Sequence, residues 1–180
     1  MNRVSDRASD KASRGSDGSG SFSGISARSW CALAVVLPLA AVGAALFTQH
    51  AWDMQPCPWC VVQRVVFLAI AVVALPGVLL RGAWARWSIG SLVALLAASG
   101  AAAALWQHFV AASSTSCALT LADRWIRNSG LDELAPQVFA AYASCADAKV
   151  NLLGVPYEFY SLTLFAVLGV VGLRVMLARR

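Results

Sequence analysis

Two cysteines separated by two residues, Cys57 and Cys60, carry the most specific chemistry in the sequence. A C-x-x-C dithiol can close into a small disulfide, so the pair can hold or release two electrons. Such a bridge closes almost no loop, and it would therefore stabilise the fold little. The pair lies directly before an apolar run that starts at Val61. Redox chemistry at the edge of a lipid bilayer points to an electron carrier that dissolves in lipid.

Arg64 follows Cys60 by four residues, so the two side chains share a face if this segment is helical. A cation there favours the thiolate over the thiol, and it would also stabilise negative charge on a reduced quinone ring. An arginine within a lipid-facing helix costs a few kcal/mol, so we expect its side chain to face a cavity or the headgroups. The alternative is an arginine that is only an anchor, with its charged end among the headgroups.

The chain has five cysteines, and the other three are Cys31, Cys117 and Cys145. Two pairs and one leftover residue is the simplest arrangement. A bridge between Cys117 and Cys145 would close a loop of about 29 residues, worth on the order of 3–4 kcal/mol, so a purely structural disulfide is an alternative to a redox-active one. A zinc site of four thiolates is a further alternative, but the wide spacing of Cys117 and Cys145 weakens it, and we predict no metal site.

The composition is that of a polytopic membrane protein. Of the 180 residues, 59% are hydrophobic and 13% are charged, which is too apolar for a soluble domain. The net charge of +5 would suggest nucleic-acid binding in a soluble protein. Here the basic residues flank apolar runs, so membrane topology explains them better, and we expect membrane lipid rather than nucleic acid around the chain.

Four apolar runs are long enough to cross a bilayer. The first covers roughly 27 Å at about 1.5 Å per helical residue. Small residues in the third provide faces on which helices can approach closely. The sequence therefore predicts an all-α membrane protein, a bundle of four transmembrane helices. The predicted spans are about residues 30–47, 61–80, 87–106 and 157–177.

The segment before the first span differs sharply from the rest. Residues 1–28 are polar and rich in Ser and Gly, and they cannot bury enough surface to offset the entropy of ordering. We therefore predict a disordered tail over residues 1–28 and a membrane domain over residues 29–180. Ten of the fourteen lysines and arginines fall on the side of the two termini, so both termini are expected in the cytoplasm.

This orientation gives two loops on the outer face, the second long and cysteine-bearing. It places Cys57, Cys60, Cys117 and Cys145 on that face and leaves Cys31 at the cytoplasmic end, where we expect no role for it. In a bacterium the outer face is the periplasm, where disulfides persist. Apolar residues of the second loop, such as Trp125, suit the membrane surface or a partner protein.

The two histidines of the chain end the first and third spans, each directly after a glutamine. A histidine at a membrane interface is commonly a hydrogen-bonded anchor. His108 is nevertheless a candidate for contact with the headgroup of a cofactor, and His50 is a weaker one.

Together these residues resemble the DsbB family of bacterial inner-membrane thiol oxidases, from about residue 30 to the end of the chain. The combination is specific, whereas a lone C-x-x-C motif is not. Gln63 departs from the glutamate of the best-known member, and fewer residues separate His108 from Cys117. The matching segments are Gln49-His50, Pro56-Cys57-Pro58-Trp59-Cys60, Arg64, Gln107-His108, Cys117, Pro136-Gln137-Val138-Phe139, Cys145 and Leu153-Gly154.

The resemblance implies a bacterial inner-membrane enzyme, a protein-dithiol:quinone oxidoreductase. Its partner would be a DsbA-type periplasmic protein of thioredoxin fold, which it reoxidises, and its electrons would pass to a quinone, with ubiquinone expected. By the same resemblance, Arg64 stands at the position that contacts the quinone and His108 at a candidate position for it.

The resemblance also implies an order of electron transfer. The thiolate of the partner would attack the Cys117–Cys145 disulfide, at Cys117, and form a mixed disulfide. The freed Cys145 would then relay electrons to the Cys57–Cys60 disulfide, and the reduced pair would pass them to the quinone with the help of Arg64.

Two other classes of function remain open at this point. A quinone reductase or vitamin K epoxide reductase-like thiol enzyme shares a four-helix bundle and a C-x-x-C motif, but its dithiol begins a late span, whereas Cys57 and Cys60 precede the second. A non-enzymatic membrane subunit would use its cysteines only as structural bridges. Thiol trapping separates these readings, because structural bridges stay oxidised whatever the state of the quinone.

Overall fold

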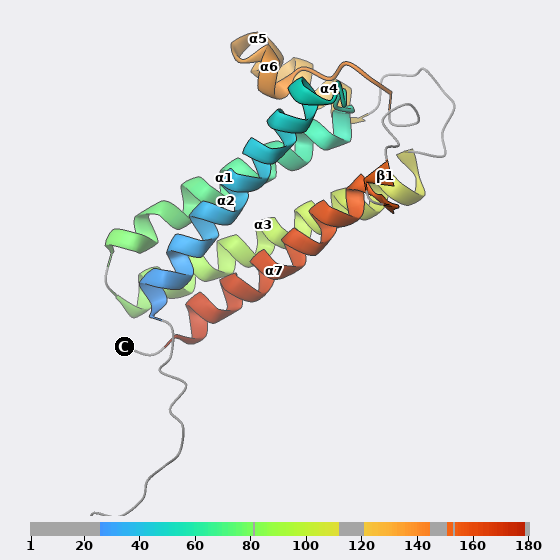
Figure 1. Cartoon of the computed structure of the whole chain (residues 1–180). Helices are drawn as coiled ribbons and strands as arrows, with labels where there is room; N and C mark the ends of the chain where they lie inside the picture. The colour runs from blue at the N-terminus through green and yellow to red at the C-terminus, as the bar shows by residue number, and fades with distance from the viewer. Residues whose placement is uncertain (1–25, 81, 112–120, 145–150, 153, 179–180) are drawn as a thin grey trace, which may run out of the picture.

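The computed structural model describes residues 26–80, 82–111, 121–144, 151–152 and 154–178 (Figure 1). Four long helices dominate it, and each is long and apolar enough to cross a membrane. The prediction of an all-α, four-helix membrane protein is confirmed. The long helices are α1 (Ala27–Ala51), α2 (Pro58–Leu79), α3 (Ala83–Phe109) and α7 (Tyr157–Leu177).

The four helices form one elongated bundle. Helix α3 packs most extensively on α7, α2 packs on both α1 and α3, and the contact between α1 and α7 is smaller. Figure 1 shows that α1 begins and α7 ends at the same end of the bundle. We call this the terminal end, and we call the other end, where α2 begins with Cys57 as its N-cap, the cysteine end.

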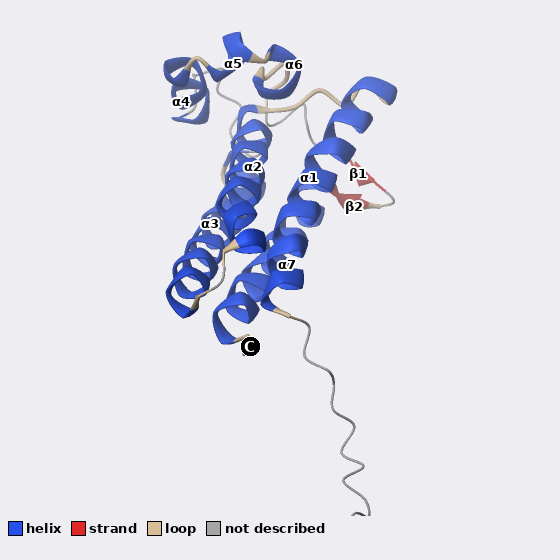
Figure 2. Cartoon of the chain, turned by 90° about the vertical axis from the view of Figure 1, so that its left-hand side faces the viewer, coloured by secondary structure: helices blue, strands red, loops and turns tan. Residues whose placement is uncertain are grey.

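Three short helices lie over the cysteine end, as Figure 2 shows. They are α4 (Leu121–Ser129), α5 (Leu131–Leu134) and α6 (Pro136–Phe139). Helices α4 and α6 both contact α2, and in α4 the side chains of Ala122 and Ile126 are buried while Trp125 is half exposed. A two-stranded antiparallel ribbon, β1 (Asn151–Leu152) and β2 (Val155–Pro156), leads into α7. The sequence had not predicted these small elements.

The first three long helices extend beyond their predicted apolar spans on at least one side. Helix α1 begins where the Ser26 side chain accepts a hydrogen bond from the backbone N–H of Ser29, at 3.2 Å. It continues through Thr48 to Ala51, because polar residues can remain helical once the helix reaches the headgroup region. Pro38 and Pro76 lie inside α1 and α2, as lipid-embedded helices permit. The predicted tail falls largely outside the described residues and stays a prediction.

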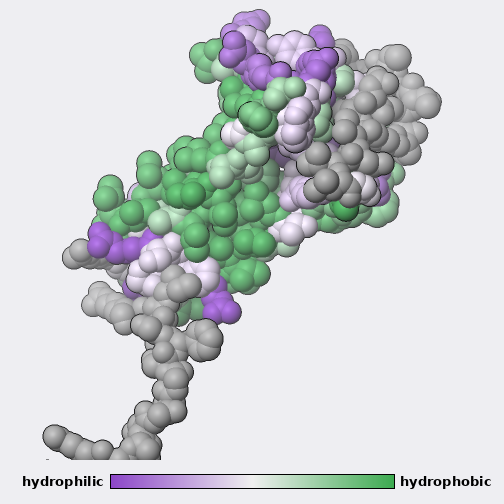
Figure 3. All heavy atoms as spheres, viewed as in Figure 1, coloured by the Kyte–Doolittle hydropathy of each residue, from purple (hydrophilic) through white to green (hydrophobic). Residues whose placement is uncertain are grey.

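The centre of the bundle is apolar and tightly packed. The rings of Phe67 and Phe165 stack with their centroids 4.1 Å apart. Nearer the terminal end, α3 and α7 approach so closely that a Cβ on Gly172 would lie 2.9 Å from the backbone oxygen of Gly90. On the face shown in Figure 3, apolar residues cover the middle of the long helices and hydrophilic residues lie toward both ends. This packing holds the polar groups of the cysteine end in fixed positions.

Candidate functional site

Cys57 and Cys60 sit at the first turn of α2. The Cys57 side chain caps the helix, because its Sγ accepts a hydrogen bond from the backbone N–H of Cys60 at 3.3 Å. Pro58 occupies the next position, where a missing N–H costs nothing. The two Sγ atoms lie 2.6 Å apart, so the pair is placed for oxidation to a disulfide. The N-terminus of a helix stabilises negative charge, which favours reactive sulfur at this position.

The two sulfurs face different surroundings. Cys57 is fully buried and packs with Ala111, just beyond the end of α3. Cys60 is partly exposed and lines a cavity. Trp59 lies between them in the chain, and its ring approaches that of Trp106 on α3, with centroids 6.4 Å apart. The Cys57–Cys60 pair therefore lies between the end of α3 and the cavity.

Two buried glutamine side chains reach toward Cys60. The Gln107 amide donates a hydrogen bond to the Cys60 Sγ at 3.4 Å. The Gln63 amide donates to the Gln107 Oε1 at 2.7 Å, and this contact orients the Gln107 N–H groups toward the sulfur. Sequence reasoning missed this role for both residues. The available signal was an amide at the end of each of two apolar runs, since a buried polar side chain requires a partner.

Arg64 is buried, and its guanidinium contacts other parts of the chain. Its NH1 group donates to the Gln49 Oε1 at 2.8 Å and to the Val138 backbone oxygen at 3.1 Å. The Gln49 amide also donates to the Gln137 backbone oxygen at 3.3 Å. Arg64 on α2 and Gln49 on α1 are thus joined to α6 of the long loop. The sequence had indicated the position of Arg64 but not its connection to Gln49 and the loop.

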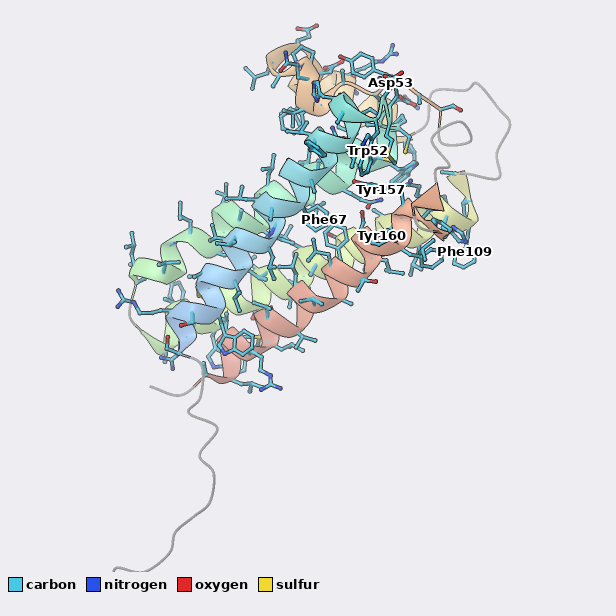
Figure 4. All side chains as sticks on the ribbon, in the orientation of Figure 1. Trp52, Asp53, Phe67, Phe109, Tyr157 and Tyr160 are labelled. Carbon is cyan, nitrogen blue, oxygen red and sulfur yellow. The ribbon has the colours of Figure 1, made fainter. Side chains whose placement is uncertain are left out.

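The cavity has a volume of about 290 Å³ and lies between α1, α2 and α7. One part of its wall is polar, with Cys60, Gln63 and Arg64 from α2 and Gln107 from α3, and the rest is largely apolar. In Figure 4 the Phe67, Tyr157 and Tyr160 side chains lie in the space between α2 and α7. The apolar lining includes Ala41, Val42, Ala44, Ala45, Phe67 and Leu164.

The structure separates the two histidines. His108 Nδ1 lies 2.8 Å from Glu158 Oε1, and Glu158 lines the cavity, whereas His108 is not among the lining residues. His50 Nδ1 contacts the backbone oxygen of Leu46 in its own helix, at 2.8 Å. Of the two, His108 is therefore the one connected to the cavity, through a carboxylate that sequence reasoning had not singled out.

Cys117 and Cys145, the predicted second pair, lie outside the described residues. Described residues that precede each of them nevertheless contact the start of α2. Ala111 packs with Cys57, and the backbone N–H groups of Tyr142 and Ala143 donate to the Pro56 oxygen at 3.0 and 3.3 Å. Both approaches to the long loop are thus anchored beside the C-x-x-C motif.

Cys31 is far from this site. It lies in α1 near the terminal end, where it is buried against Gly77 of α2. A Cβ on Gly77 would lie 2.7 Å from the Cys31 Sγ, so the thiol fills the space that the glycine leaves. Its described surroundings are those of a packing residue.

The chain is similar to known proteins of one family. Residues 27–175 match the family described as "Disulfide bond formation protein DsbB". A disulfide bond formation protein B from Cupriavidus metallidurans is 30% identical over 138 residues, which are 75% of this chain and 83% of the relative. Another from Alkalilimnicola ehrlichii is 32% identical over 159 residues, which are 83% of this chain and 93% of the relative. A third from Herminiimonas arsenicoxydans is 33% identical over 139 residues, which are 76% of this chain and 85% of the relative.

Proposed function

The chain belongs to the DsbB family of disulfide bond formation proteins, and we propose that it oxidises a periplasmic protein dithiol and passes the electrons to a quinone. The coarser identity, a multi-pass membrane oxidoreductase of disulfide formation, follows from the family and from the four apolar helices. The observation that carries the proposal is the position of one cysteine pair between two surfaces. Cys57 faces the anchored ends of the long loop, and Cys60 faces the cavity.

Electron entry is assigned to the long loop. A DsbA-type partner of thioredoxin fold would attack the Cys117–Cys145 disulfide at Cys117, and Cys145 would then attack the Cys57–Cys60 disulfide. Thiol–disulfide exchange needs direct contact between sulfurs. Ala143 is hydrogen-bonded to Pro56, the residue before Cys57, and it precedes Cys145 by two residues, a chain length of about 7 Å at full extension. This anchoring supports the relay.

Electron exit is assigned to the cavity, whose residues fit a quinone headgroup. A flat, apolar ring with oxygens at opposite edges requires an apolar slot and a few donors. The alanines of α1 and the Phe67 ring supply the slot, and Arg64 and the tyrosines supply donors. When bound there, a quinone supplies the two-electron acceptor. Cys60, rather than Cys57, is the sulfur that reaches this space.

The residues around Cys60 prepare its sulfur for the transfer. The helix N-terminus, the Gln107 amide and the Arg64 guanidinium all stabilise negative charge near that atom. Arg64 is itself held by Gln49 and by the Val138 oxygen, so its position changes little as charge moves. Preorganised donors of this kind act without reorganising at the moment of reaction.

The remaining assignments follow from charge distribution and family. We place the protein in the bacterial inner membrane with the cysteine end toward the periplasm and both termini in the cytoplasm. Ten of the fourteen lysines and arginines lie on the side of the termini, which supports this orientation. Ubiquinone is the proposed acceptor, and residues 1–28 are proposed to form a disordered cytoplasmic tail.

Anaerobic mixing tests the function directly. Purified full-length protein, a reduced DsbA-type partner and ubiquinone are combined, and quinone reduction is followed by its ultraviolet absorbance. We expect turnover by the wild type and by Cys31→Ser, and none by Cys57→Ser or Cys60→Ser, because each active-site serine removes one sulfur of the relay. Quinone-dependent turnover in Cys57→Ser would refute the assignment.

A further inference from the structure

A polar pair connects α3 with α7 at the cysteine end. His108 Nδ1 and Glu158 Oε1 are 2.8 Å apart, and the two side chains are 32% and 7% exposed. Glu158 lines the same cavity as Cys60 and Arg64, whereas His108 is not among the lining residues. The pair therefore runs from the wall of the cavity to a partly exposed side chain in the last turn of α3.

We infer that His108 and Glu158 form a proton-transfer pair that delivers protons from water at the cysteine end into the cavity. The inference rests on the proposed function, because a quinone is the group that would need them. The two residues exchange one proton along their hydrogen bond. His108 takes a proton from water at Nε2 and releases one from Nδ1, and Glu158 receives it at Oε1 and presents it to the cavity.

The stoichiometry is satisfied by such a route. Oxidation of the Cys57–Cys60 dithiol to a disulfide releases two electrons and two protons. Reduction of a quinone to its hydroquinone consumes two electrons and two protons. The electrons leave through Cys60, and the thiol protons are lost to water at the cysteine end. Two passages through His108 and Glu158 return two protons, and between passages the imidazole ring turns to exchange protons with water and regain its Nδ1–H form, so the overall reaction balances with no further reactant.

The geometry meets the requirements for proton transfer. Donor and acceptor must be within hydrogen-bond distance, and 2.8 Å satisfies this. An imidazole can accept a proton on one nitrogen while it donates from the other. The His108 ring is held between the edges or faces of Phe109 and Phe159, at centroid distances of 4.9 and 4.8 Å. The two rings flank the imidazole while its Nδ1 faces Glu158.

Burying the Glu158 carboxylate costs free energy, which a role in proton transfer would explain. A buried ionisable group in a membrane helix is expensive and commonly marks a path for ions or protons, and Glu158 is buried in the first turn of α7. Helices could be joined here by an uncharged hydrogen bond at lower cost. The other titratable groups that line the cavity among the described residues are Cys60, Arg64, Tyr157 and Tyr160. Arg64 donates instead to Gln49 and Val138, and Glu158 is paired with His108.

The test compares Glu158→Gln and His108→Gln with His50→Gln in the full-length protein. Each replacement keeps a side chain that can form hydrogen bonds, but the first two cannot relay a proton. His50 is the matched control, because it contacts only a carbonyl of its own helix among the described contacts. Protein reduced beforehand is mixed anaerobically with a water-soluble ubiquinone analogue, and one turnover is followed by stopped flow. Equilibrium binding of the analogue and the thermal unfolding temperature are measured alongside.

We expect the single-turnover rate to fall about 100-fold in Glu158→Gln and His108→Gln, which is the usual effect of losing one acid–base group. Quinone affinity and unfolding temperature should stay near the wild type, and His50→Gln should behave as wild type. Added imidazole should partly restore the rate of His108→Ala, because it can replace the missing proton carrier. A merely structural pair would show no such rescue.

Each other outcome overturns the inference. An unchanged single-turnover rate in Glu158→Gln would show that the pair does not transfer protons. A loss of quinone affinity large enough to explain a slower rate would show that the pair binds the quinone or holds the helices in place instead. If Glu158→Gln fails to fold, His108→Gln decides by the same criteria. Failure of the wild type to reduce the quinone would instead refute the proposed function, which separates the two ideas.

Discussion

The two ends of the bundle are made from the same apolar helices, yet they bury different groups. At the terminal end, α3 and α7 meet through glycines, and Cys31 fills the space above Gly77. At the cysteine end, the helices bury three glutamines, an arginine and a glutamate. These polar residues are Gln49, Gln63, Arg64, Gln107 and Glu158.

This difference suggests separate roles, with the terminal end contributing to stability and the cysteine end to chemistry. Close packing between small residues suffices to hold helices together in lipid, where apolar surface provides little driving force. Buried polar groups are costly, and they persist at the cysteine end because each contacts another polar group or a backbone carbonyl. A substitution at one end should therefore affect folding, and a substitution at the other should affect electron transfer.

The largest expected effect is at Arg64. Replacing it with Gln removes the buried cation from the cavity wall; losing one charged contact to the quinone, worth about 3 kcal/mol, should raise KM for quinone on the order of 100-fold. The KM of Arg64→Lys should lie between those of the wild type and Arg64→Gln, because lysine keeps the charge but not the planar set of donors. Steady-state kinetics with varied ubiquinone measures both.

Arg174 supplies the control for that comparison. It lies in the last turn of α7 at the terminal end and is exposed, so Arg174→Gln should leave KM unchanged. An equal rise in both variants, or an unchanged KM in Arg64→Gln, would reduce Arg64 to an anchor and remove the distinction between the two ends.

The next effect is on stability at the terminal end. In Gly172→Val the added Cβ would lie 2.9 Å from both the Gly90 oxygen and the Ala94 nitrogen, so we expect a loss of about 1–3 kcal/mol in unfolding free energy. Turnover per folded molecule should be retained. Reversible unfolding in mixed detergent measures the first quantity, and the quinone assay measures the second.

Gly43 is the matched glycine, because a Cβ there would meet nothing within 4 Å. Gly43→Ala in the interior of α1 should be neutral or stabilising by about 0.5–1 kcal/mol. A Gly172→Val protein of normal stability but lost turnover would contradict the assignment of the terminal end to packing.

The smallest effect concerns Gln107. Gln107→Leu removes the N–H that contacts the Cys60 sulfur, and a typical net hydrogen bond of about 1 kcal/mol predicts a severalfold loss of thiolate reactivity. The rate at which an alkylating agent labels reduced Cys60 at fixed pH reports it. Ser99→Ala, which removes only an exposed contact to the Leu96 carbonyl of the same helix, should leave that rate unchanged. Equal rates in the two variants would show that the amide does not act on the sulfur.

Sequence alone determined the membrane class, the four spans and the sulfur pair. Hydrophobic length and composition are local properties, and lipid allows few ways to satisfy a backbone, so the long apolar segments had to be helices. The C-x-x-C spacing placed Cys57 and Cys60 on one helical turn, and Arg64 followed on the same face.

Only the tertiary structure decided what surrounds that turn. Gln49, Gln107 and Glu158 come from three helices far apart in the chain, and their side chains meet the site through packing that no local pattern encodes. The separation of Cys57 from Cys60, one toward the long loop and one toward the cavity, likewise depends on how α3 and α7 pack against α2. Contacts between distant segments depend on the shape of the whole bundle, whereas helix and span are fixed by neighbours in sequence.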